Sequence, residues 1–142
     1  MKSIGFFLLL SSAALIGSEE GIGNAPVKDF ALKRFTQAGP LDLVLRGTEA
    51  SYPSADRIDI IDLNLTRFSG DASQRIEDIL LSEAATFLPN QNLVLGDKSV
   101  RVIRDDMEMT GEKWSYNHAE KKVSIGKNVR VVFKTRLADI LK

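Results

Sequence analysis

The sequence predicts an all-β fold in which repeated short antiparallel strands form a jelly roll or a flattened barrel. Apolar and polar residues alternate over much of the chain, which is typical of strands with one buried face. A pattern of apolar pairs and polar turns also occurs three times. The length of 142 residues is enough for one domain, and we expect roughly nine to eleven strands.

The N-terminal segment has the layout of a secretory signal. Lys2 precedes an apolar run at residues 4–17, and small and acidic residues follow. This run of 14 residues is shorter than the roughly 20 that a membrane-spanning helix needs. We therefore expect residues 1–17 to be a signal peptide, with a short N-terminal anchor as the alternative. The rest of the protein should lie beyond the cytoplasmic membrane.

The segment that follows, residues 18–28, contains two glycines, a proline and several charges, and we expect a flexible lead-in. The β domain is expected to occupy residues 29–134. Alternation is clear in LDLVLRG (41–47) and in RIDIIDLNLTRF (57–68), which are therefore predicted strands.

Three segments, beginning at Gly47, Ser82 and Gly111, share one pattern. Each continues with an aromatic residue, a polar turn, an apolar pair, a shorter polar break and a second apolar pair. The starts are 35 and 29 residues apart, a spacing typical of stacked supersecondary units. Stacking lets each unit cover its neighbour's apolar face and pair its exposed edges.

Two segments are ambiguous. SQRIEDILLS (73–82) has apolar residues at helical spacing, but its neighbours favour a strand, which is our prediction. The tail KTRLADILK (134–142) has helical spacing, and we expect residues 135–142 to form a short C-terminal turn or helix.

Composition excludes several classes of function. Lys and Arg total 19, as do Asp and Glu, so nucleic acid is not an expected partner. The absence of cysteine excludes disulfides, thiolate metal sites and a lipidated N-terminal cysteine. His118 is the single histidine and is expected to be a solvated turn residue, and adjacent Asp105 and Asp106 fit a turn better than a catalytic pair. We expect no enzyme activity, no cofactor and no metal.

The inward rows of the predicted strands are aliphatic and aromatic. Two interpretations stay open from the pattern alone: a closed core filled by side chains, or two walls with an apolar slot between them that holds a lipid. The candidate lining residues are Leu43, Leu45, Tyr52, Ile58, Ile60, Phe87, Leu93, Leu95, Trp114, Tyr116, Val123 and Ile125.

The last strong strand has basic residues at Lys127, Arg130 and Lys134. It could be a solvated outer face, an edge protected by charge, or an edge that pairs with a partner domain. The residues expected to dock a partner by strand pairing are Asn128, Val129, Arg130, Val131, Val132 and Phe133.

Three motifs resemble one known family. They are GPLDLVLRGTEA (39–50), TGEKWSY (110–116) and VSIGKNVRV (123–131). In this order, and after an export signal, they are similar to the LptC/LptA (OstA-like) group of lipopolysaccharide-transport proteins, closest to LptC. The similarity covers about residues 29–134.

The resemblance implies a twisted β jelly roll, open along one side, that holds lipid A acyl chains in its apolar interior. It implies partners as well: lipopolysaccharide, the inner-membrane lipopolysaccharide ABC transporter, and an LptA-like periplasmic jelly-roll protein joined through edge strands. It places the protein in the periplasm, with association with the inner membrane left open. The alternative is a structural or adaptor β domain with a filled core that binds protein partners by edge-strand pairing.

Overall fold

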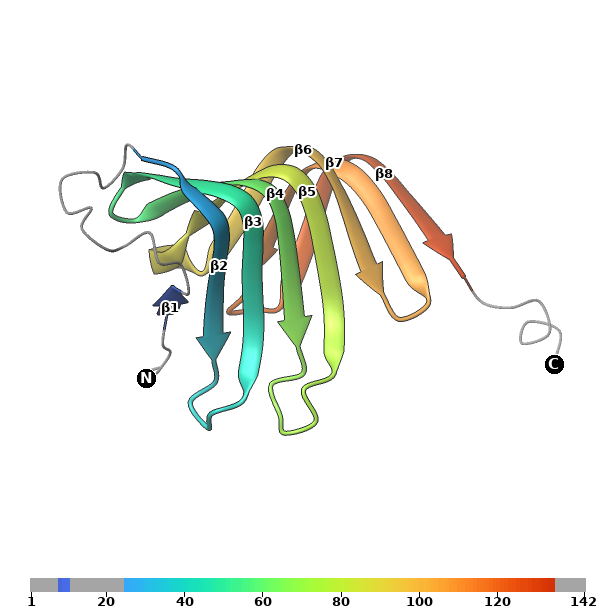
Figure 1. Ribbon diagram of the computed structural model, residues 1–142. Coiled ribbons are helices and arrows are strands. Elements are labelled where there is room, and N and C mark those ends of the chain that lie inside the picture. The colour runs from blue at the N-terminus through green and yellow to red at the C-terminus, as the bar shows by residue number, and fades with distance from the viewer. Residues whose placement is uncertain (1–7, 11–24, 135–142) are drawn as a thin grey trace, which may run out of the picture.

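The computed structural model describes residues 8–10 and 25–134, which form one antiparallel sheet in chain order (Figure 1). The all-β prediction is therefore confirmed. Within these ranges, one 3₁₀ turn, η3 (Pro89–Gln91), lies between two strands. The strands are β1 (Leu8–Leu10), β2 (Val27–Phe35), β3 (Leu41–Ser54), β4 (Arg57–Phe68), β5 (Ile76–Leu88), β6 (Leu93–Arg104), β7 (Met107–Asn117) and β8 (Lys122–Phe133).

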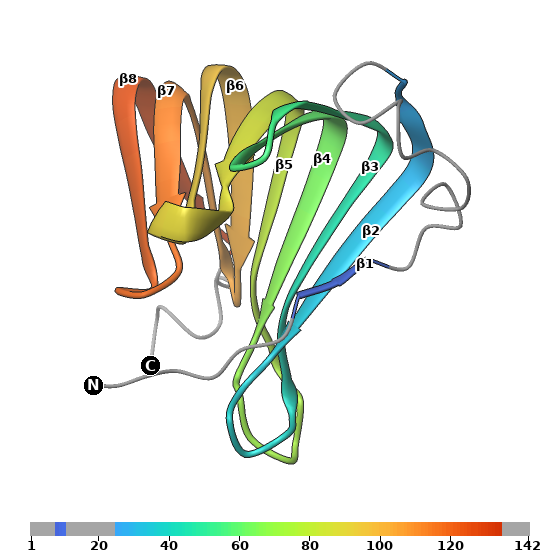
Figure 2. The ribbon, with the colours of Figure 1, turned by 90° about the vertical axis from the view of Figure 1, so that its left-hand side faces the viewer.

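The long strands bend near their middle, so the sheet is folded over itself along a crease (Figures 1 and 2). Four residues at the crease, Asp29, Asp62, Lys113 and Asn128, have φ between 52° and 57°. This left-handed region is uncommon for residues with side chains, and Asp and Asn enter it most readily. The pairing register also slips at the crease, for example between Gly96 and Ser99, as at a β-bulge that bends a strand.

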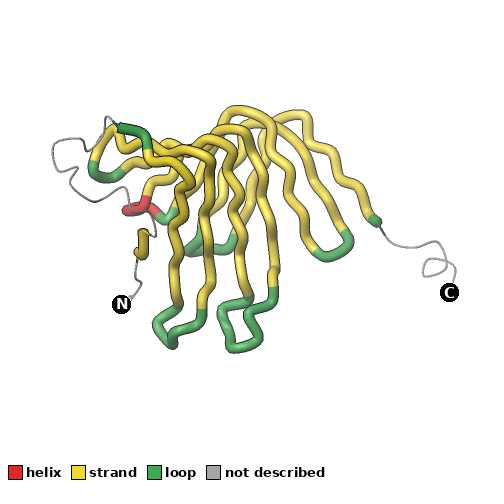
Figure 3. The backbone as a smooth tube through the Cα atoms, viewed as in Figure 1, coloured by secondary structure: helices red, strands yellow, loops and turns green. Residues whose placement is uncertain are grey.

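The crease divides the sheet into two walls. We call the halves at residues 30–35, 41–46, 63–68, 76–82, 99–104, 107–112 and 127–133 the front wall. We call the halves at 49–54, 57–61, 84–88, 93–96, 114–117 and 122–125 the back wall. The tube in Figure 3 shows that few residues lie outside strands, and the rest form the turns at the outer ends of the walls.

The structure explains the pattern that occurs three times in the sequence. Each segment starts at the crease, forms one hairpin of the back wall, crosses the crease again and ends in the front wall. The shorter break in each segment is the crease itself, at Asp62, Gly96–Ser99 and Asn128. In each segment the two apolar pairs lie on one long bent strand, so the strands are fewer and longer than the roughly nine to eleven short strands that we expected.

The space between the walls holds the hydrophobic core. On the front wall one cross-strand row is entirely apolar, as the register shows: Leu32, Leu45, Leu65, Leu80, Val102, Met109 and Val131. The prediction that Leu93 and Leu95 face inward is wrong, because Val94 between them is buried and both are partly exposed. Because Leu93, Val94 and Leu95 are all apolar, the sequence does not show whether Val94 or its two neighbours face inward.

The ambiguous segment 73–82 contributes to β5 and is a strand, as predicted. Val27 and Lys28, which the sequence assigned to the lead-in, begin β2. Within the expected signal peptide, β1 pairs with the edge of β2, and the rest of that segment lies outside the described residues. So does the tail at 135–142. Among the described residues, none belongs to a helix long and apolar enough to cross a bilayer.

Candidate functional site

The twelve candidate lining residues lie on both walls, and seven of them are buried in the core. Tyr52, Val123 and Ile125 are partly buried and pack against that core, whereas Leu93 and Leu95 do not belong to it. The structure thus brings together ten of the twelve. The seven buried residues are Leu43, Leu45, Ile58, Ile60, Phe87, Trp114 and Tyr116.

The apolar interior continues onto strand β8, where it is exposed. Val131 pairs with Met109, and Phe133 pairs with Met107, so both extend rows of the front wall. Val129, Val131 and Phe133 are nevertheless 53%, 43% and 68% exposed. The interior is therefore covered from β2 to β7 and open at the β8 end.

The candidate docking residues 128–133 form the front-wall half of β8. β8 is one edge of the described sheet and pairs only with β7 among the described strands. Val132, next to Val131, pairs with Glu108 on the outer face and is 46% exposed. This edge consequently presents backbone hydrogen-bonding groups together with apolar side chains.

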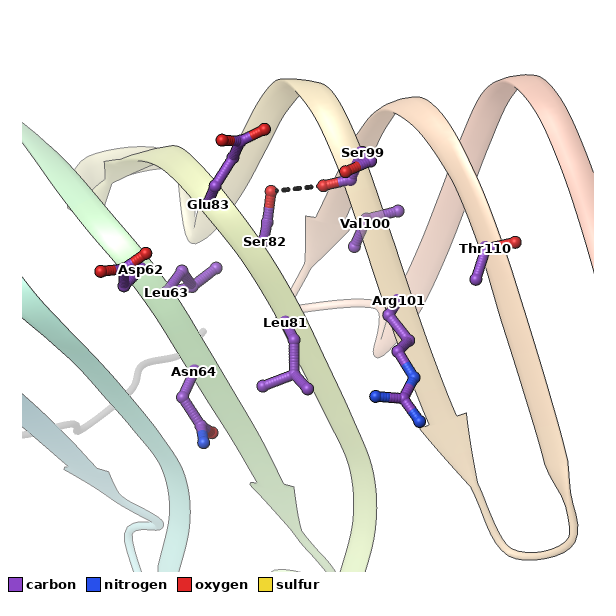
Figure 4. Close-up of a pocket in the computed structure, with 10 residues that line it drawn as sticks. All are labelled: Asp62, Leu63, Asn64, Leu81, Ser82, Glu83, Ser99, Val100, Arg101 and Thr110. Carbon is purple, nitrogen blue, oxygen red and sulfur yellow. Dashed lines mark hydrogen bonds between the residues drawn. The ribbon is translucent and has the colours of Figure 1, made fainter.

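A depression of about 590 Å³ lies on the outer face below the crease (Figure 4). Asn64, Leu81 and Arg101 line it, and they alternate along their strands with buried core residues. At its upper edge the Ser82 hydroxyl donates to the Ser99 carbonyl at 2.7 Å, which fastens β5 to β6 at the crease. A second depression, around Arg46 and Thr48, also flanks the crease. None of the twelve candidates lines either depression.

A polar network joins the walls at their outer ends. The Tyr116 hydroxyl lies 2.7 Å from His118 Nδ1, and His118 Nε2 lies 3.0 Å from Asp42 Oδ2. A neutral ring satisfies both contacts if it accepts from Tyr116 and donates to Asp42. The expectation that His118 is a solvated turn residue is wrong: it is 4% exposed and links the turn after β7 to β3.

The charges in this network are shifted by burial and by one another. Burial lowers the pKa of His118, and the hydrogen bond with Asp42 opposes this only in part. Burial acts to raise the pKa of Asp42, but the hydrogen bond with His118 and the nearby cations lower it overall. Burial also lowers the pKa of Lys121, whose Nζ lies 3.7 Å from Asp42 Oδ2. The network therefore contains a neutral imidazole beside an ionised carboxylate.

A second charged cluster lies on the front wall at the same end of the interior. Asp78 is fully buried and accepts a hydrogen bond from Arg67 Nε at 2.6 Å and another from Arg104 Nε. Sequence reasoning missed this cluster. The sequence did contain a signal, because residues two apart on a strand face the same side. Asp78 lies two residues from inward-facing Leu80, and Arg104 lies two residues from inward-facing Val102.

Neither cluster has the composition of a metal site. No group of acidic or histidine side chains within the described ranges could hold a metal ion. The described part of the molecule combines an apolar interior, a charged outer end and an open sheet edge.

Comparison with known proteins gives matches of two kinds. The family model described as "Lipopolysaccharide-assembly, LptC-related" matches residues 27–134. The solved structure of LptH from Pseudomonas aeruginosa, described as the LptA homologous periplasmic component of the conserved lipopolysaccharide transport device, is similar in fold, with a TM-score of 0.60. That similarity covers 92% of this chain and 96% of LptH at 15% identity. No curated protein sequence gives a significant match.

Proposed function

The chain belongs to the LptC-related family of lipopolysaccharide-assembly proteins, and from this premise we propose that it is a non-enzymatic periplasmic carrier of lipopolysaccharide. In this proposal the acyl chains of lipid A lie between the walls at the β8 end. The observation that carries it is the exposed continuation of the apolar interior at Val129, Val131 and Phe133. Covering such a surface with acyl chains is favourable by about 0.8 kcal/mol per CH₂ group.

Acyl chains would first contact Val123, Ile125 and Met109, which are partly buried against the core. The deeper candidates, such as Leu45 and Tyr116, are fully packed in this structure and would meet lipid only if the walls moved apart. We therefore place the lipid at the β8 end and treat the deeper residues as the packed floor beneath it.

The proposed carrier receives lipopolysaccharide from the inner-membrane ABC transporter and passes it to an LptA-like jelly-roll protein. The edge of β8, which pairs only with β7 among the described strands, supports the second step, because a strand of the partner could add to it and continue the apolar interior from one domain to the next. Residues 128–133 would make this contact.

The alternative function is a structural or adaptor domain that binds proteins through the same edge and carries no lipid. The observation that favours it is the tight packing of the core between β2 and β7, where the buried apolar side chains contact one another. Both functions use β8, so the discriminating property is lipid binding.

The test compares Val131→Glu with Val132→Glu. Val131 faces the interior and Val132 the outer face, so the two variants place the same charge on opposite faces of one strand. We expect purified wild-type protein and Val132→Glu to retain lipopolysaccharide in mass spectrometry, and Val131→Glu to lose most of it. Circular dichroism confirms that the variants are folded. A wild-type protein that neither purifies with lipid nor takes it up from lipopolysaccharide micelles would contradict the carrier function and support the adaptor.

A further inference from the structure

On the front wall, one cross-strand row of inward-facing residues contains charged side chains, although the adjacent row is apolar. The register aligns Arg34 with Leu43, Leu43 with Arg67, and Arg67 with Asp78. Asp78 then bonds Arg104 of the next strand. The row one step closer to the crease contains only Leu, Val and Met. We call Arg34, Arg67, Asp78 and Arg104 the charged row.

Packing alone does not require these charges. Replacing buried ion pairs by apolar residues of similar volume is often neutral or stabilising, and the adjacent row shows that this wall accepts aliphatic side chains throughout. A buried carboxylate such as Asp78 needs partners, and here it holds two guanidinium groups through their Nε atoms. The Nη groups of Arg67 and Arg104 make no hydrogen bond with any residue that the structure describes.

The charged row has an excess of positive charge. Lys121 and Asp42 lie at the same end of the interior, since both interact electrostatically with Arg34, and Lys121 interacts with Arg67 as well. Three cations (Arg67, Arg104 and Lys121) thus meet two carboxylates (Asp42 and Asp78), and His118 is uncharged because burial lowers its pKa. The chain as a whole carries no net charge, so the local excess is a property of this end of the interior.

The charged row is also continuous with the open apolar surface. Arg104 pairs with Met107, and Met107 pairs with Phe133 at the exposed end of β8. The side chain of Arg104 is 35% exposed and that of Arg67 is 17% exposed. A ligand that covers Phe133 with its apolar part can therefore reach Arg104 with its polar part.

We propose that Arg67 and Arg104, held in place by Asp78, bind the phosphate groups of an anionic amphiphile whose acyl chains lie over the β8 end. This proposal rests on the proposed carrier function and adds to it the chemistry that recognises the headgroup. Guanidinium groups suit the task because their planar N–H donors match phosphate oxygens in pairs. Asp78 fixes the orientation of both groups, so less side-chain freedom is lost on binding.

The test measures the affinity of the full chain for two probes in detergent micelles: lipid A with both phosphates, and the same lipid A after enzymatic removal of the phosphates. We expect the wild-type protein to prefer the phosphorylated lipid by roughly tenfold or more. Arg104→Gln should weaken binding of phosphorylated lipid A roughly fivefold to tenfold and leave dephosphorylated lipid A unaffected. Arg67→Gln should act in the same direction.

Arg101→Gln is the matched control. Arg101 lies on the same strand as Arg104, faces outward and forms an ion pair with Glu108. Its replacement should therefore leave the affinities for both lipids unchanged. Arg104→Lys keeps the charge without the planar donor pair, and we expect it to retain part of the preference. Glutamine at 104 can still bond Asp78, and the melting temperature of each variant shows whether it is folded.

Three outcomes overturn the proposal in distinguishable ways. If the wild-type protein binds both lipids equally and Arg67→Gln and Arg104→Gln change nothing, the carrier function stands and the phosphate site is wrong. If it binds neither lipid, the carrier function fails and the phosphate site fails with it. If inorganic phosphate at millimolar concentration displaces phosphorylated lipid A completely, the row is a site for free phosphate and not for a lipid headgroup.

Discussion

The side chain of His118 connects the two walls at the end of the interior away from the crease. It lies between Tyr116 and Asp42, with Lys121 and Arg34 nearby. Because burial lowers its pKa in the folded state, the unfolded chain binds a proton more readily than the folded one. His118 therefore contributes stability that is complete above its usual pKa of 6.5 and is lost as the pH falls below that value.

We predict that the melting temperature of the wild-type protein falls more steeply between pH 7 and pH 5 than that of His118→Gln. The glutamine amide can both donate and accept hydrogen bonds but does not titrate, so this part of the pH dependence disappears. The measurement is thermal unfolding followed by circular dichroism at several pH values. Glu120→Gln, an exposed change in the same turn, should behave as the wild type does. Parallel curves for wild type and His118→Gln would refute this role of the histidine.

The position of His118 could not be predicted from the sequence. Its turn is polar, so the local pattern indicates a solvated residue, whereas its partner Asp42 lies 76 residues away along the chain. The charged row could not be predicted from the sequence for a related reason. Arg34, Arg67, Asp78 and Arg104 become neighbours only through the register of five strands, β2 to β6.

Each long strand serves both walls, and the crease allows it to do so. Gly47 lies at the crease of β3, where an added Cβ would meet Ile60 Cγ2 at 2.4 Å and the Ile61 carbonyl oxygen at 2.8 Å. The sequence predicted the strand on each side of the crease, because alternation is a local property. It did not predict that the polar breaks are bends within one strand, since a bend and a turn share the same residue types.

We predict that Gly47→Ala lowers the free energy of unfolding by about 1–3 kcal/mol, since the new methyl group must displace the Ile60 side chain or the backbone of β4. Arg46→Ala changes the adjacent, outward-facing residue and should stay within about 0.5 kcal/mol of the wild type. Urea denaturation followed by tryptophan fluorescence, with Trp114 as the single reporter, measures both. Equal stabilities of the two variants would mean that β3 does not need close approach at Gly47.

The described part of the molecule is a folded sheet. Its interior is covered from β2 to β7 and exposed at β8. The resemblance of its motifs predicted the open jelly roll and the family, and both are confirmed. The end at which the interior opens was not predictable. Val129 and Val131 alternate just as Leu63 and Leu65 do, but Leu63 and Leu65 are buried because β4 has neighbours on both sides, whereas no described strand follows β8.

The most direct test of acyl-chain binding between the walls is a photo-crosslinking scan along β8. A photoreactive amino acid is placed at each position from 129 to 133, one at a time, and crosslinked lipopolysaccharide is detected after irradiation. We expect crosslinks at positions 129, 131 and 133, which face the interior, and little or none at 130 and 132, which face outward. Uniform crosslinking along the strand, or none at the three inward positions, would contradict the carrier function.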